Sequence, residues 1–216
     1  MKKYIEKLHF ITHDIAQHSH VDQVQFACEA GAKWVQYRCL TKDDEELLAD
    51  INLIAQICDD WGATLIVTDH VHLAGKADIQ GFHIEDMDAD FISLRANLGE
   101  AYTLGGSANT VDNLIRLEKE GADYAGFGPF STTNTKPNDY PLLGFTGYAE
   151  AVKELNSKLI DLPILAVGGV TLDDVTSLLS TGIFGVAVSS AIHQAEDLRT
   201  AYEDFHTAVS SQQKNS

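Results

Sequence analysis

The chain has 216 residues, of which 44% are hydrophobic and 22% are charged, and its formal net charge is −17. This size and composition predict one globular domain over residues 1–209, followed by a disordered C-terminal tail at 210–216. The acidic balance argues against nucleic acids and anionic membranes as partners, because both bind basic surfaces.

Short β-branched runs alternate with longer amphipathic segments along the whole chain. The short runs predict eight strands, at 8–11, 34–37, 64–67, 81–83, 101–104, 124–127, 164–167 and 185–188. The amphipathic segments predict helices at 22–30, 43–60, 111–120, 147–157, 172–180 and 198–209. This alternation indicates parallel pairing, and eight strands predict a single (β/α)8 TIM barrel of the α/β class. A doubly wound open sheet is the alternative, since it also alternates strands and helices.

Four glycines, Gly31, Gly62, Gly121 and Gly182, stand between an expected helix and the next strand. Each is expected to end its helix in the left-handed conformation. In a TIM barrel the amino ends of the strands serve stability and the carboxyl ends carry function, so we expect these glycines to be scaffold.

The loop after the sixth expected strand is crowded with hydroxyls and carries one ammonium. Thr133, Thr135 and Lys136 suit a phosphorylated small molecule, because hydroxyls are rotatable donors and lysine is a compact cation. A solvated polar turn is the alternative for such a composition.

The ends of the last two expected strands have a similar pattern. Gly168 and Gly169 precede a helix start that Thr171 is expected to cap, and Ser189 and Ser190 follow the eighth strand. Parallel barrels commonly hold phosphate at their seventh and eighth strands, so these residues are candidate anion donors.

Polar side chains also follow the second to fifth expected strands. They are Gln36, Arg38, Thr68, Asp69, Glu85, Asp86, Asp88, Ser107 and Asn109. Asp69 and Asp88 could share one Mg²⁺, which prefers a few carboxylates together with substrate phosphate oxygens. Arg38 and Lys136 would neutralise the rest of a diphosphate. A single aspartate after a strand is otherwise an N-cap or part of a solvated turn.

Other chemistries have weak support in the sequence. Three cysteines without C-x-x-C spacing fit reduced thiols, and His70 with His72 lacks the further ligands of a zinc site. His83 is interpreted as a residue of the core or of the barrel interior. No segment reads as a signal peptide or a membrane span, so we expect a cytoplasmic protein.

Seven segments of the chain resemble the thiamine phosphate synthase family, also called thiamine-phosphate pyrophosphorylase, in order and along nearly the whole length. They are residues 31–38, 65–74, 81–84 with Asp88, 105–110, 126–136, 166–170 and 185–188. The resemblance implies a transferase that joins hydroxymethylpyrimidine diphosphate to a thiazole phosphate, giving thiamine monophosphate and pyrophosphate. It also implies a Mg²⁺ requirement, a dissociative mechanism and, at the level of the family, a homodimer.

The resemblance assigns roles by position. Gln36, Arg38 and Lys136 would hold pyrophosphate, and Asp69 and Asp88 would bind Mg²⁺. Ser107 would lie near the reacting pyrimidine, and Thr68 stands where the family usually has a substrate-binding asparagine. Thr133 and Thr135 would bind the thiazole, while Gly169, Ser189 and Ser190 would hold its phosphate. Arg38, Ser107 and Lys136 are the expected catalytic residues.

The chain departs from the family pattern at the diphosphate end. Leu40 replaces a usual lysine, Thr68 an asparagine, and Glu85 and Asp86 a Gly-Gln pair; Lys42 could supply the missing cation. These departures keep open a non-catalytic barrel that binds thiamine phosphate. A thiazole tautomerase is the other alternative, although its catalytic histidine is expected near Ser107, where this chain has Asn109.

Overall fold

The computed structural model describes residues 3–15, 17–132 and 140–211, in which eight parallel strands close into one barrel. The strands are β1 (Leu8–Ile11), β2 (Trp34–Tyr37), β3 (Thr64–Thr68), β4 (Gly81–Ile84), β5 (Thr103–Ala108), β6 (Tyr124–Phe127), β7 (Ile164–Ala166) and β8 (Gly185–Val188). Neighbours in sequence pair in order, and β8 closes on β1 with Leu8 opposite Val186. The prediction of a TIM barrel is confirmed.

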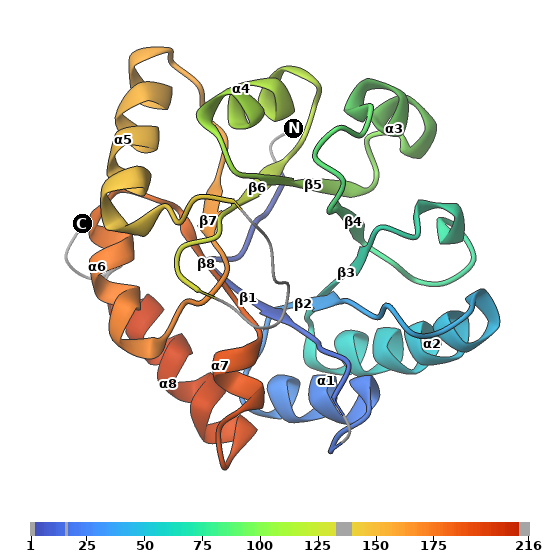
Figure 1. The fold of residues 1–216 in the computed structure, drawn as a ribbon. Coiled ribbons are helices and arrows are strands. Elements are labelled where there is room, and N and C mark those ends of the chain that lie inside the picture. Colours follow the sequence, from blue (N-terminus) through green and yellow to red (C-terminus); the bar gives the residue numbers. More distant parts are fainter. Residues whose placement is uncertain (1–2, 16, 133–139, 212–216) are drawn as a thin grey trace.

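The helices form a ring outside the barrel (Figure 1). They are α1 (His20–Glu29), α2 (Asp44–Trp61), α3 (Phe91–Leu98), α4 (Val111–Lys119), α5 (Gly144–Ser157), α6 (Val175–Ser180), α7 (Ser190–His193) and α8 (Leu198–Ser211), with short 3-10 turns η1 (Val71–Leu73) and η2 (Leu172–Asp174). No helix within the described ranges is long and apolar enough to cross a membrane.

The barrel has two hydrophobic clusters because successive strand residues point to opposite faces. On β2, Val35 belongs to the larger cluster between strands and helices, which also contains Phe10 and Phe82. Its neighbour Trp34 belongs to the smaller cluster, with Tyr124 and other residues of the strands. The second cluster fills the barrel interior, so the barrel is a packed core rather than a pore.

Local signals in the sequence explain where several helices begin and end. Gly62 ends α2 with a φ of 61°, as predicted for the glycine repeat. Thr171 caps η2 rather than a long helix, and its hydroxyl and amide both contact Asp174, at 2.6 and 2.9 Å. The expected helix at 172–180 is therefore divided into η2 and α6.

The largest shift from the expected elements is at β5. The expected strand at 101–104 lies at Thr103–Ala108 instead, and it contains Gly105 and Gly106. A Cβ on Gly105 would stand 2.1 Å from the Tyr124 ring, so only glycine fits against that side chain. α3 and α7 were not predicted, and α8 continues through Ser210 and Ser211, while residues 212–216 lie outside the described ranges.

Candidate active site

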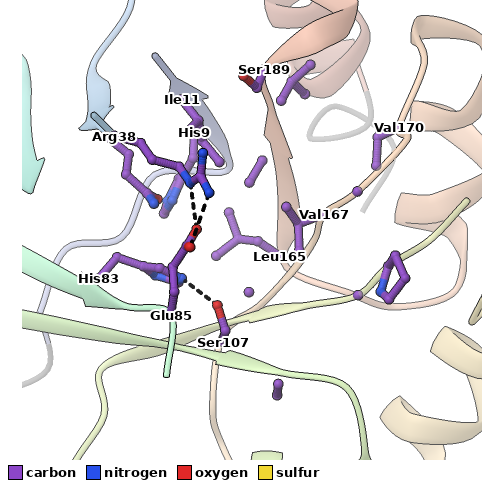
Figure 2. Close-up of a pocket in the computed structure, with 18 of the residues that line it drawn as sticks. His9, Ile11, Arg38, His83, Glu85, Ser107, Leu165, Val167, Val170 and Ser189 are labelled. Atoms are coloured by element: carbon purple, nitrogen blue, oxygen red, sulfur yellow. Dashed lines mark hydrogen bonds and ion pairs between the residues drawn. The ribbon is translucent and has the colours of Figure 1, made fainter. Parts of the chain in front are cut away.

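A cavity of about 1090 Å³, part of it open to solvent, lies at the carboxyl ends of the strands. Six of the residues expected in a site line it: Gln36, Arg38, Ser107, Gly169, Ser189 and Ser190. Thr68 contacts this set, since its hydroxyl accepts a hydrogen bond from Gln36 Nε2 at 3.0 Å. Figure 2 shows Arg38, Ser107 and Ser189 around the cavity. Thr133, Thr135 and Lys136 lie outside the described residues.

Aromatic rings close the inner end of the cavity. His9 stacks on Trp34 with ring centroids 4.4 Å apart, and Tyr124 meets both rings edge-on. All three side chains are buried. Burial lowers the pKa of His9 well below its usual range, so its imidazole is neutral at pH 7.

His83 belongs to the cavity wall, which the sequence alone did not reveal. One ring nitrogen lies 3.1 Å from the Tyr124 hydroxyl, and the other lies 3.1 Å from the Ser107 hydroxyl. Gly126 packs closely against this ring, since a Cβ there would stand 3.3 Å from it. His83 therefore fixes the Ser107 hydroxyl at the cavity wall (Figure 2).

An ion pair crosses the mouth of the cavity between Arg38, which follows β2, and Glu85, which follows β4. Arg38 Nε donates to one carboxylate oxygen at 2.7 Å and Nη2 to the other at 3.3 Å. The Arg38 side chain is 7% exposed and that of Glu85 18%. The Arg38 backbone is held as well, because its N–H donates to Thr12 Oγ1 at 3.0 Å.

The two aspartates expected to bind metal follow β3 and β4, and neither Asp69 nor Asp88 is among the residues that line the cavity. Asp69 adopts a left-handed backbone with a φ of 60°, which is uncommon for a residue other than glycine and often marks a functional position. Its Oδ1 accepts from the Glu85 N–H at 2.8 Å. Asp88 is exposed, and its N–H donates to Asp86. These hard oxygen donors are of the kind that Mg²⁺ prefers.

Two groups of three potential metal ligands occur within the described part of the chain, and neither contains Asp69 or Asp88. One is Asp14, His20 and Cys39, and the other is Asp44, His70 and His72. The first is tied together by hydrogen bonds: Asp14 Oδ1 lies 3.1 Å from His20 Nε2 and accepts from the Cys39 thiol at 3.4 Å. The assignment of Asp69 and Asp88 to Mg²⁺ stays a prediction.

Two features mark the ends of β7 and β8: the hydroxyl of Ser189, and Gly169, whose backbone lies against the backbone of the loop after β6. Ser189 Oγ is buried and has no hydrogen-bond partner among the described residues. Buried hydroxyls are nearly always paired, so an unpaired one that lines a cavity marks a position where a ligand atom can bind. Gly169 has a φ of 70°, and a Cβ there would stand 2.6 Å from Thr132 O.

The position of the absent lysine is exposed to solvent. Leu40 is 65% exposed, so its side chain carries little packing. Lys42, the candidate replacement cation, instead pairs with Asp50 of α2 at 2.6 Å. The hydrogen bond to Asp50 raises the pKa of Lys42.

A family model, the curated relatives and a solved structure point to one family. Residues 8–192 match the family described as thiamine monophosphate synthase. A thiamine-phosphate synthase of Bacteroides thetaiotaomicron is 38% identical over 190 residues, covering 88% of this chain and 91% of the relative. One from Phocaeicola vulgatus is 38% identical over 191 residues, covering 88% and 92%. The solved structure of a thiamine phosphate pyrophosphorylase from Pyrococcus furiosus superposes with a TM-score of 0.83 at 27% identity, covering 95% of this chain and 96% of that one.

Proposed function

The chain belongs to the thiamine monophosphate synthase family, and from that premise we propose how the cavity performs the reaction. The protein is a thiamine-phosphate synthase, a transferase that condenses hydroxymethylpyrimidine diphosphate with thiazole phosphate to give thiamine monophosphate and pyrophosphate. The observation that carries the site assignment is the buried guanidinium of Arg38 in the same cavity as the unpaired hydroxyl of Ser189. Two phosphorylated substrates require two such anion positions.

The diphosphate end is assigned to the side of the cavity formed after β2 and β5. Arg38, with Gln36 and Lys136, binds the diphosphate, and Ser107 contacts the bond that breaks. The carbon–oxygen bond of the pyrimidine methylene breaks first, and the diphosphate leaves with the electron pair. Fixed positive charge lowers this barrier because it neutralises charge that develops on the leaving group.

The thiazole end is assigned to the ends of β7 and β8. Gly169, Ser189 and Ser190 bind the thiazole phosphate through amides and hydroxyls, and Thr133 and Thr135 contact the ring. The thiazole nitrogen then adds to the pyrimidine-stabilised cation. This step needs orientation rather than proton transfer, because the nitrogen lone pair is already free. His9 in the cavity wall is neutral, so it can form hydrogen bonds there without adding charge next to the cation.

The carboxylates that follow β3 and β4 are the candidate Mg²⁺ ligands. Asp69 and Asp88 would hold the ion, and their oxygen donors fit its preference for hard ligands. When bound, Mg²⁺ supplies additional neutralisation of the diphosphate. We further propose a cytoplasmic homodimer whose partners are its phosphorylated substrates.

Purified protein incubated with both substrates tests this function. We expect equal amounts of thiamine monophosphate and pyrophosphate, measured by chromatography and by a coupled pyrophosphate assay, and loss of both when EDTA removes the metal. Substrate binding by calorimetry without product would favour the non-catalytic alternative. Isomerisation of a thiazole carboxylate phosphate without pyrophosphate release would favour the tautomerase.

A further inference from the structure

The ion pair between Arg38 and Glu85 occupies one edge of the guanidinium that can bind an oxyanion at two points. Arginine binds carboxylate and phosphate with the same two-point geometry, and here Nε and Nη2 both donate to Glu85. Both side chains line the cavity. If the diphosphate takes the same Nε and Nη2 donors, as a two-point contact on this edge requires, the two anions compete for one set of donors.

The backbone around Glu85 explains why its side chain stands at this position. The Glu85 N–H donates to Asp69 Oδ1 at 2.8 Å, and the Asp69 N–H donates to His83 O at 2.9 Å. These bonds anchor the first residue after β4 to the end of β3. The carboxylate then reaches across the mouth to Arg38, 47 residues away in sequence.

Displacement of Glu85 has an electrostatic consequence. Its side chain is 18% exposed, so a released carboxylate would stay partly desolvated next to a diphosphate. Like charges in such a place repel strongly unless a cation lies between them. Asp69, which is bonded to the same backbone, is one of the candidate ligands for that cation.

We propose that Glu85 is an internal counter-ion of Arg38 that the diphosphate displaces, and that this exchange makes diphosphate binding depend on a divalent cation. The inference rests on the proposed function, because it places the diphosphate at Arg38. In the absence of metal, Glu85 stays paired with Arg38, and inorganic pyrophosphate therefore binds weakly. With metal, Asp69 and the displaced carboxylate would hold a cation that neutralises the diphosphate, and binding would become tight.

Calorimetric titration of the protein with inorganic pyrophosphate, in EDTA and in excess Mg²⁺, tests the proposal. The variant Glu85→Gln keeps the size of the side chain and an oxygen for Arg38 but removes the charge. We expect it to bind pyrophosphate about tenfold or more tightly than the original protein in EDTA, and the gain from Mg²⁺ to shrink by the same factor. Thermal melting checks that the variant is folded.

Asp173→Asn is the matched control, because Asp173 is an exposed carboxylate after β7, on the same end of the barrel as Arg38. It loses the same charge without touching the ion pair. Equal effects of the two variants would mean that net charge governs binding, and unchanged binding in Glu85→Gln would mean that the carboxylate does not compete. Either result overturns the counter-ion role. Failure of the original protein to bind pyrophosphate with Mg²⁺, or to form product, would instead overturn the proposed function beneath it.

Discussion

Replacing Ser189 by alanine should change stability and substrate binding in opposite directions. Its hydroxyl is buried without a partner among the described residues, and an unsatisfied buried polar group costs about 1–3 kcal/mol. Removing that group should therefore raise the free energy of unfolding by about 1 kcal/mol. If the hydroxyl donates to the thiazole phosphate, the same change removes a hydrogen bond to a charged group, worth about 1.5–3 kcal/mol. We expect the KM for thiazole phosphate to rise about 10- to 100-fold.

Urea unfolding and steady-state kinetics on Ser189→Ala measure the two effects. Ser107→Ala is the informative comparison, because the Ser107 hydroxyl already has a partner in His83 at 3.1 Å. That variant should lose stability rather than gain it. A Ser189→Ala protein that is less stable than the original and binds thiazole phosphate equally well would refute the argument, since the hydroxyl would then serve the fold alone.

Four further changes test the site and the scaffold. Asp69→Asn, which suits the left-handed backbone, should lower turnover at least tenfold and raise the Mg²⁺ concentration needed for half-maximal activity; an unchanged metal titration would remove Asp69 from the ligand set. Leu40→Lys should not lower activity or melting temperature, because the side chain is 65% exposed, and a large loss in either assay would contradict this. Gly105→Ala should destabilise the fold by several kcal/mol in urea unfolding, since its Cβ would clash with Tyr124; a variant of normal stability would show that the ring can move. Burial lowers the pKa of His193 to about 4, so as the pH falls the unfolded chain binds a proton at this residue before the folded chain does. The free energy of unfolding should therefore decrease by about 2–3 kcal/mol from this group between pH 7 and pH 4. Urea unfolding at several pH values should show a smaller decrease for His193→Gln and an unchanged one for a variant of the exposed His206.

The sequence predicted most of the barrel because its strands are short β-branched runs between helices that end in glycine. The bounds of β1, β2, β6 and β8 agree with the prediction residue for residue. β5 was misplaced because Gly105 and Gly106 weaken the strand pattern. The two glycines are needed by the tertiary structure, since Tyr124 on one face of the strand and Phe91 on the other leave no space for a Cβ. α3 was missed because only Phe91 of its eight residues is buried, which gives no periodic apolar face.

The candidate site could be predicted only in part from the sequence. Residues directly after strands, such as Arg38 and Ser189, could be found by their position alone, because parallel strands bring their carboxyl ends together. The pairing of Arg38 with Glu85 could not, since it depends on how two loops 47 residues apart meet in space. Nor could the contact of His83 with Ser107, because a histidine within an apolar strand looks the same whether its ring faces the core or a cavity.

The packed rings of His9, Trp34 and Tyr124 block the interior of the barrel, so the cavity does not continue to the other end. Both reactants must arrive, and both products depart, through one opening at the strand ends. Whichever molecule sits nearer the rings is trapped until the outer one has gone. The two ligands should therefore bind in a fixed order and leave in the reverse order. An excess of the outer ligand should slow the release of the inner one.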